Sequence, residues 1–445
     1  MKLIQTIKNI WKIEDLRKRL IITFSFIVIY RFGCYVVLPG LNPADLDAMR
    51  KFTSGGLMQL LDMFSGGAFS QASIFALGIM PYITASIVIQ LLGMVVPSFQ
   101  KMQREGESGR MKLNQYTRYL TVLILLVQAP AYLVNLKYQV MQAGGTVEMG
   151  FWPMLYLTIV LTAGAMFIMW LGEKITDKGI GNGISMIILV GIIARFPGAL
   201  VQEFTSRLTT AQGGLVMFLI EIILLFAVTA GAVMLTQGTR KVPVQYAKRI
   251  VGNKQYGGAR QYIPLKVNAA NVMPIIFAQA LMFIPITLAG FGASQNESGF
   301  LASMARTFGN MDGFWYNLVY FILIVAFTYF YTAITVRPTQ MAEEMKKNSG
   351  FIPGIKPGKK TADYLDSIMS RITLPGSIFL GIVAIMPAFA RQFGVSQNFA
   401  QFFGGTSLLI TVGVVLDTLQ QIETHLMMHH YDGLMKSGKV KGRTQ

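Results

Sequence analysis

The sequence has few of the residues that build metal sites and disulfide frameworks: 3 histidines and 1 cysteine, Cys34, among 445 residues. A single cysteine excludes intrachain disulfides and a cysteine-ligated metal cluster. Charged residues are also scarce, at 13% of the chain, whereas apolar residues reach 53%. Because soluble globular domains contain about 25% charged residues, this composition excludes an ordinary soluble protein and predicts a membrane protein.

No pairing of a nucleophile with a base stands out, so we expect no enzymatic activity, no cofactor and no metal. Residues 433–439 match the glycine and lysine spacing of a phosphate-binding loop, but Val440 replaces the Ser or Thr that would bind Mg²⁺. His425 and His429 have helical spacing without the His-Glu-x-x-His pattern of metalloproteases. We interpret both features as parts of a basic tail at the membrane surface.

Long stretches without Asp, Glu, Lys or Arg predict the membrane-spanning helices, because a span needs about 20 mostly apolar residues. Two spans contain one tolerated charge, Arg31 or Glu221, and the shortest must continue past Arg195 or tilt. The ten predicted spans lie within 20–38, 63–100, 119–136, 149–172, 179–194, 208–239, 267–296, 313–336, 372–390 and 392–416. The sequence therefore predicts an all-α membrane protein with ten transmembrane helices.

The positive charges are distributed unevenly between the two sides of the predicted bundle. Segments on the side of the termini carry 31 Lys and Arg residues, and the opposite loops carry 7. Loops rich in Lys and Arg stay in the cytoplasm, so both termini are expected there. Two cytoplasmic loops, 237–270 and 337–371, are long and basic, and the first has no acid at all. They favour an anionic partner such as ribosomal RNA or an acidic protein, with lipid headgroups as the alternative.

The uncharged stretch 63–100 is too long for one span. As a single helix it would measure roughly 57 Å at 1.5 Å per residue, whereas the hydrocarbon core is about 30 Å thick. Glycine permits tight turns, so we expect a break at Ser65-Gly66-Gly67 and a full span over 72–96. The short segment before the break is predicted to be a re-entrant half-helix against an internal cavity. A helix at the membrane surface is the alternative.

The charged residues within the predicted spans are Arg31 and Glu221, and Asp417 follows directly after the last span. The pattern leaves open whether Arg31 and Glu221 pair with each other or reach an interface. Ten spans with a broken helix also fit a secondary transporter of a small solute. Ion-coupled transporters usually need acids or histidines in mid-bundle, so this scarcity argues against that alternative.

Several strings, in order along nearly the whole chain, resemble the bacterial SecY family of protein-conducting channels. They are DMFSGGAFSQASIFALGIMPYITASIVIQLL (62–92), GESGR (106–110), QYTRY (115–119), MWLGEKITDKGIGNGIS (169–185), PLKVN (264–268), FIPGIKPG (351–358) and FGGTSLLI (403–410). The resemblance implies two inverted-repeat halves, 1–200 and 201–424, hinged at about 195–213, and a cytoplasmic tail, 425–445. It implies a channel that moves unfolded secretory polypeptides and releases hydrophobic segments sideways into lipid.

The resemblance also implies roles for particular residues. A ring of isoleucines at the waist of the pore would be Ile79, Ile83, Ile184, Ile188, Ile276 and Ile410. Such a ring would gate water and ions by dewetting, although packing in the bundle or against lipid also accounts for isoleucine. A plug at about 57–72 would contain Phe64, Ser65, Gly66, Gly67 and Ala68. Polar residues on the helices of a lateral gate would be Gln90, Gln128 and Gln279, with packing inside each half as the alternative.

The resemblance further implies partners and a location. We expect SecE and SecG subunits, the SecA motor ATPase, the ribosome, signal peptides with nascent chains, and lipids, in the inner membrane of a bacterium. The chain offers no energy chemistry, so a partner ATPase or translation would drive transport. Docking would use Lys248, Arg249, Lys254, Arg260, Lys356, Lys359 and Lys360. The family usually has Arg where Lys356 stands, which keeps the charge but loses bidentate geometry.

Overall fold

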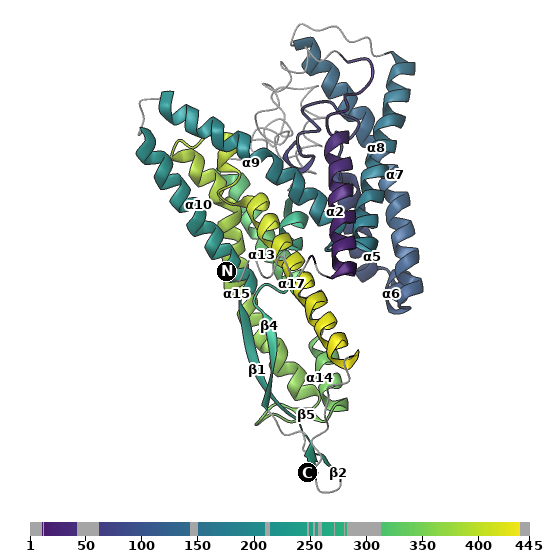
Figure 1. Cartoon of the computed structure of the whole chain (residues 1–445), viewed down its shortest axis with the longest axis vertical. Coiled ribbons are helices and arrows are strands. Elements are labelled where there is room, and N and C mark those ends of the chain that lie inside the picture. Colours follow the sequence, from purple (N-terminus) through teal and green to yellow (C-terminus); the bar gives the residue numbers. More distant parts are fainter. Residues whose placement is uncertain are drawn as a thin grey trace. The chain divides into compact units, whose positions relative to one another are not determined.

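The computed structural model describes residues 11, 13–41, 62–142, 150–209, 214–246, 249–251, 254–256, 260–270, 272–279, 281–282 and 313–436. Its elements are mostly long helices, and the strands β1–β5 all lie between α10 and α15 in the sequence (Figure 1). Contacts divide the chain into two units, Met1–Leu200 with Val414–Gln445 and Val201–Gly413. The chain passes from one unit to the other within two helices, α9 (Gly183–Thr209) and α17 (Gly405–Lys436).

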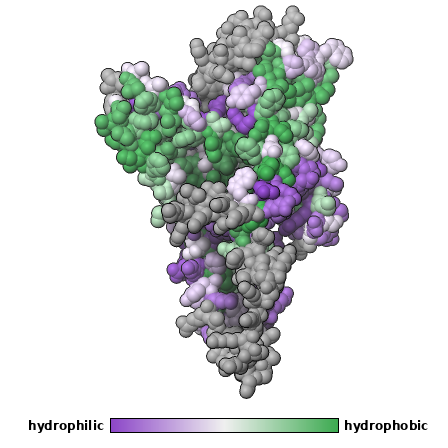
Figure 2. All heavy atoms as spheres, in the orientation of Figure 1, coloured by the Kyte–Doolittle hydropathy of each residue, from purple (hydrophilic) through white to green (hydrophobic). Residues whose placement is uncertain are grey.

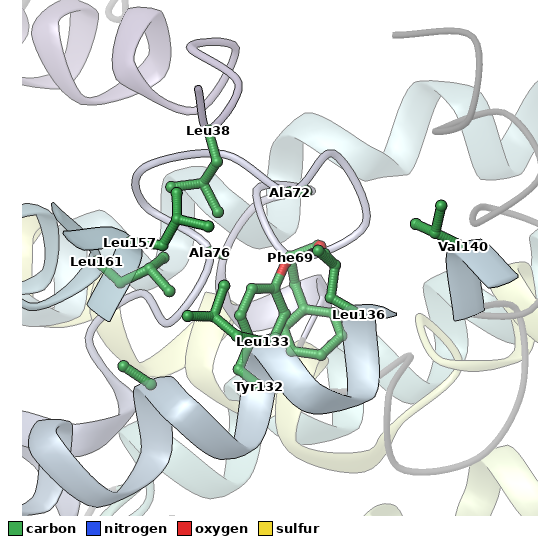
Figure 3. Close-up of a cluster of buried hydrophobic side chains, with 11 residues drawn as sticks. Leu38, Phe69, Ala72, Ala76, Tyr132, Leu133, Leu136, Val140, Leu157 and Leu161 are labelled. Atoms are coloured by element: carbon green, nitrogen blue, oxygen red, sulfur yellow. Dashed lines mark hydrogen bonds between the residues drawn. The ribbon is translucent and has the colours of Figure 1, made fainter. Parts of the chain in front are cut away.

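The first unit is built from helices that lie side by side (Figure 1). Helix α8 contacts α2 and α7, and α7 also contacts α5 and α6. Apart from the parts of α9 and α17, the helices that the structure describes in this unit are α2 (Glu14–Gly33), α5 (Met80–Val95), α6 (Pro97–Arg104), α7 (Glu107–Gln142) and α8 (Phe151–Lys178). Their apolar faces enclose a core that includes Leu133, Leu161 and Leu38, none of them more than 1% exposed (Figure 3).

Side chains from distant helices hold the short loop between α8 and α9. The backbone N–H of Ile180 donates to Thr23 Oγ1 of α2 at 3.1 Å, and that of Gly181 donates to Gln421 Oε1 of α17 at 2.9 Å. Asn182 Oδ1 then accepts from the N–H of Ile184 at 3.1 Å, which caps the start of α9. The orientation of α9 is therefore set by contacts with both ends of the chain.

The second unit combines apolar helices with a small sheet. Besides its parts of α9 and α17, it contains α10 (Gly214–Gln237), α13 (Phe314–Thr335), α14 (Pro338–Lys347), α15 (Lys359–Gln392), α16 (Gln397–Ala400), β1 (Thr239–Tyr246), β2 (Arg249–Val251), β3 (Lys254–Tyr256), β4 (Arg260–Lys266) and β5 (Gly350–Phe351). Helix α15 packs along α13 and contacts α10 and α14. Apolar side chains gather over the exposed surface of α10, which fits a helix that faces lipid (Figure 2).

The strands form an antiparallel sheet of order β4-β1-β5, with β2 and β3 paired separately. Alternate residues of a strand face opposite sides, and β1 buries Val242 and Val244 while its neighbours stay more exposed. These valines join Leu265, Met345 and Leu365 in a core between the sheet and α14 and α15. Hydrophilic residues lie exposed beside the strands in the view of Figure 2, and β1 itself exposes Arg240 and Lys241.

Seven helices within the described ranges are long and apolar enough to cross a membrane, and α5 with α6 makes an eighth if that bent pair is one span. Helix α2 misses this standard because five of its first six residues are charged. Residues 283–296 of the predicted seventh span lie outside the described residues, and 273–279 before them are helical. The predicted span 179–194 continues past Arg195, as expected, as part of α9.

The structure corrects three expectations. The span predicted over 72–96 begins only at Met80, because residues 65–79 form successive turns. The region 195–213, where a hinge was expected, is helical as far as Thr209, and Glu203 and Arg207 pair within it one helical turn apart. The loop 237–270 holds strands, which the expectation of an all-α protein did not include; in β1 the buried residues Val242 and Val244 alternate with more exposed neighbours.

We predict that Leu365→Ala loosens the sheet. Leu365 is 1% exposed in the core beside β1, and a Leu-to-Ala change at such a site costs about 2–5 kcal/mol. Hydrogen exchange of the β1 amides should speed up accordingly. The neighbouring change Asp366→Ala, at an exposed position of the same helix, is the control and should leave exchange unchanged. Equal exchange in the two variants would contradict the packing described for Leu365.

Candidate functional site

The segment from Asp62 to Ile79 fills the interior of the first unit with irregular backbone. Residues 62–64 are helical, and turns follow as far as α5. Gly66 and Gly67 have φ values of 66° and 94°, a conformation that favours glycine. The break therefore lies where the sequence predicts it. We call residues 62–72 the plug segment; residues 57–61 of the predicted plug lie outside the described residues.

All five predicted plug residues are buried: Phe64, Ser65, Gly66, Gly67 and Ala68. Side chains of α2 bind their backbone. The hydroxyl of Tyr30 donates to Ser65 O at 3.2 Å, and Arg31 Nη1 donates to Gly66 O at 2.9 Å. The Sγ of Cys34, the single cysteine, lies 3.8 Å from Ser65 O. Arg31 therefore binds the plug segment and not Glu221, which settles the pairing that the sequence left open.

Helix α9 approaches the plug segment at two points. A Cβ added to Gly191 would lie 3.2 Å from Gly66 N and from Phe64 O, so the two backbones touch. One turn further along, Arg195 forms an ion pair with Asp62 and donates to Ser70 Oγ at 3.1 Å. Glycine at position 191 is therefore required by close approach.

Asp62 also organises the plug segment internally. Its Oδ1 accepts from the N–H of Ser70 at 2.7 Å, and its backbone carbonyl accepts from the N–H of Gly67 at 2.8 Å. Its side chain is 4% exposed, whereas that of Arg195 is 31% exposed. Asp62 thus closes the turn around the two glycines and also joins the turn to α9.

A third helix, α7, contacts the end of the turn. The hydroxyl of Tyr132 donates to Phe69 O at 3.0 Å, and the two rings meet edge to face at 4.8 Å. Figure 3 shows these rings beside Leu133 and Leu136, with Ala72 and Ala76 of the turn segment close by. The plug segment is therefore held by α2, α7 and α9 together.

Residues 184, 188, 191 and 195 share one face of α9, because their spacings are four, three and four residues. Two of them, Gly191 and Arg195, touch the plug segment. Ile184 and Ile188 of the predicted ring continue the same stripe toward the start of the helix. Ile188 is 3% exposed and Ile184 is partly buried.

The other ring residues lie in both units. Ile79 is 2% exposed and precedes α5, and the N–H of Ile83 donates to Ile79 O at 3.1 Å. Ile410 of α17 is 1% exposed, and Ile276 lies partly buried in the helical residues 273–279. Each position is consistent with an interior location within its own unit.

The three glutamines predicted at the gate have different surroundings. Gln90 Nε2 donates to Ser86 Oγ on its own helix at 3.3 Å, Gln128 is exposed on α7, and Gln279 is 4% exposed. The bond of Gln90 agrees with the alternative of packing inside one half.

The predicted docking residues divide into two groups. Lys356, Lys359 and Lys360 are exposed at and before the start of α15, where Thr361 Oγ1 donates to Lys356 O at 3.0 Å. The other four belong to the loop 237–270: Arg249, Lys254 and Arg260 lie in β2, β3 and β4, and Lys248 lies outside the described residues.

Sequence reasoning missed Asp62, Tyr132, Gly191 and Arg195 as plug contacts. A signal existed for the last two, since they continue the helical spacing of Ile184 and Ile188. Nothing in the sequence pointed from Tyr132 to Phe69, which lies 63 residues away. The partner of Glu221 was missed too: it is Arg207, which also pairs with Glu203.

Comparison with known proteins identifies the family. The family model described as SecY matches residues 73–419. The protein translocase subunit SecY of Streptomyces galbus is 43% identical over 435 residues, which cover 96% of this chain and 98% of the relative. The chain belongs to the SecY family. The SecY subunit of Mycobacterium bovis is 41% identical and covers 95% of this chain and 97% of its own.

Solved structures agree on the fold. A structure described as a protein-conducting channel has a TM-score of 0.59 at 19% identity and covers 92% of each chain. Canine Sec61, from a ribosome–channel complex of the endoplasmic reticulum, has a TM-score of 0.55 at 19% identity with the same coverage. This SecY-family chain therefore has the ten-helix channel fold, and a small-solute transporter finds no support among these relatives.

We predict that Gly191→Val displaces the plug segment. The added side chain would meet backbone atoms of Phe64 and Gly66, and overpacking of this kind costs about 1–3 kcal/mol. The ion conductance of the idle channel complex in planar bilayers should rise by roughly tenfold. Gly198→Val on the same helix is the matched control, because a Cβ there meets nothing within 4 Å. A rise of equal size in both variants would show that helix distortion, and not contact with the plug segment, is the cause.

Proposed function

We propose that this chain is the channel subunit through which unfolded secretory polypeptides cross the membrane, and that it releases hydrophobic segments sideways into lipid. The observation that carries this proposal is the plug segment, an irregular buried turn held inside a unit of apolar helices. Irregular backbone at membrane depth is tolerated only inside protein or beside a watery cavity. A turn that can leave such a place opens a path for a chain.

The stripe on α9 supports the isoleucine ring. Gly191 and Arg195 touch the plug segment. On the same face of α9, Ile188 lies about one turn and Ile184 about two turns before Gly191. We propose that they form the waist of the pore with Ile79, Ile83, Ile276 and Ile410. Apolar side chains offer no hydrogen bonds to a passing polypeptide and exclude ions by dewetting.

The gate and the halves complete the proposal. We propose two inverted-repeat halves, 1–200 and 201–424, with the tail 425–445 in the cytoplasm. A lateral gate would carry Gln90, Gln128 and Gln279. A hydrophobic signal peptide would leave through the gate because apolar residues gain free energy in lipid while charged ones lose it.

The driving force would come from partners. We propose that the SecA motor or a translating ribosome docks on the exposed bases at the start of α15 and on the strands of the loop 237–270. SecE and SecG would be the companion subunits. The location would be a bacterial inner membrane, since 31 bases on the side of both termini favour a cytoplasmic position.

Photocrosslinking of a stalled secretory chain tests the pore. A photoreactive residue placed in turn at Ile83, Ile188, Ile276 and Ile410 should form adducts with the stalled polypeptide. Ile322, which is 55% exposed on the apolar helix α13, is the control position and should form none. If a preparation that translocates gives no adduct at any of the four isoleucines, the ring is wrongly assigned.

Binding of ribosomes tests the docking surface. We predict that the triple change Lys356→Gln, Lys359→Gln and Lys360→Gln weakens binding and reduces the slope of log affinity against log salt by up to about 3, since each phosphate contact contributes about 0.9. Lys346→Gln with Lys347→Gln removes exposed bases of α14 from the same loop as the control. An equal loss per charge in both variants would mean that overall charge, and not this surface, attracts the ribosome.

A further inference from the structure

The plug segment carries one carboxylate, that of Asp62, and among the described residues its cationic partner is Arg195. Arg195 makes a second contact with the same turn, through Ser70 Oγ at 3.1 Å. The guanidinium also lies beside Gly67, since an added Cβ there would be 3.4 Å from Arg195 Nη2. One side chain of α9 therefore reaches three residues of the turn.

The two members of this pair differ in their access to water. The side chain of Asp62 is 4% exposed and that of Arg195 is 31% exposed. Loss of Arg195 would leave a carboxylate buried without a countercharge, which is strongly unfavourable. Loss of the Asp62 charge would leave a guanidinium that is only partly buried, at much smaller cost.

The remaining anchors of the turn are neutral on the plug side. Tyr30, Arg31 and Tyr132 all donate to backbone carbonyls, those of Ser65, Gly66 and Phe69. A carbonyl that loses its donor can bind water when the turn moves. Asp62 is thus the charged group of the turn, and its countercharge is carried by a helix.

We propose that Asp62 and Arg195 form a releasable latch, in which Arg195 is the positioning residue that keeps the plug segment closed. The displaced turn carries Asp62 into water, and Arg195 is solvated where it stands. This inference rests on the proposed function, because it assigns the resting contact of the plug.

Cys34 provides a native reporter of the latch. It is the single cysteine of the chain, is 2% exposed, and lies 3.8 Å from Ser65 O of the turn. Departure of the turn uncovers it. The rate at which a water-soluble maleimide labels Cys34, in the complete channel complex in lipid vesicles, therefore measures how often the plug segment leaves its place.

Arg195→Gln should raise the labelling rate about tenfold, and Asp62→Asn should raise it less, because burial of an unpaired carboxylate is the larger penalty. The double change, Asp62→Asn with Arg195→Gln, should label more slowly than Arg195→Gln alone, since it removes the stranded charge. A merely structural role of Arg195 predicts no such rescue. Arg195→Lys keeps the charge and should lie between the wild-type protein and Arg195→Gln, which gives a second test if the glutamine variant fails to assemble.

Arg118→Gln is the matched control, because it breaks another ion pair of the same unit, that with Glu173 at 2.7 Å, without touching the turn. Its labelling rate should equal that of the wild-type protein. The latch is wrong if Arg195→Gln labels at the wild-type rate, or if the double change labels as fast as Arg195→Gln. Translocation by wild-type vesicles is measured in parallel. If the wild-type protein translocates but Arg195→Gln does not change the labelling rate of Cys34, the latch alone is rejected. If the wild-type protein does not translocate, the proposed function is rejected.

Discussion

Backbone polar groups at membrane depth need partners inside the protein, and this constraint determines how the plug segment is held. Helices satisfy their own N–H and C=O groups, but a turn cannot. The carbonyls of Ser65, Gly66 and Phe69 receive hydrogen bonds from three helix side chains, two tyrosines and an arginine. Each donor comes from a rigid element, so the helices prescribe one resting place for an otherwise irregular segment.

Close approach of backbones provides the second constraint. Gly66 and Gly191 meet without side chains between them, and a Cβ on Gly66 would lie 3.0 Å from Gly191 Cα and 2.9 Å from Arg31 Nη1. Ala68 and Ala72 beside them are 0% exposed. Small residues permit this close approach but bury little apolar area. Hydrogen bonds and one ion pair therefore determine much of the position in which the plug segment rests. Such contacts can be exchanged for water, which suits a segment that has to leave and return.

Much of the helical framework follows from sequence because the physics behind it is local. Runs of apolar residues predict spans, and the glycines at 66 and 67 predict the break between helices. The turns at 72–79 were missed because apolar residues there satisfy a helix pattern while their packing holds them in turns. The contacts of Tyr132 with Phe69 and of Arg207 with Glu221 join separate elements, and no spacing rule reports them. The family motifs predicted a ring and a plug, but the side chains that hold the plug segment required the structure.

The two arginines of α9 show how burial separates a permanent ion pair from a releasable one. Arg207 is 6% exposed, pairs with Glu203 and Glu221, and donates to Gly394 O at 2.9 Å, while Glu203 Oε2 accepts from the N–H of Ser396 at 2.9 Å. Breaking that cluster would strand several buried charges at once, so it fixes α9, α10 and the turn before α16. Among the described residues Arg195 pairs with one carboxylate, that of Asp62, and its side chain is 31% exposed. On the same helix, Arg207 therefore forms a permanent structural ion pair, whereas Arg195, by our proposal, forms a releasable one.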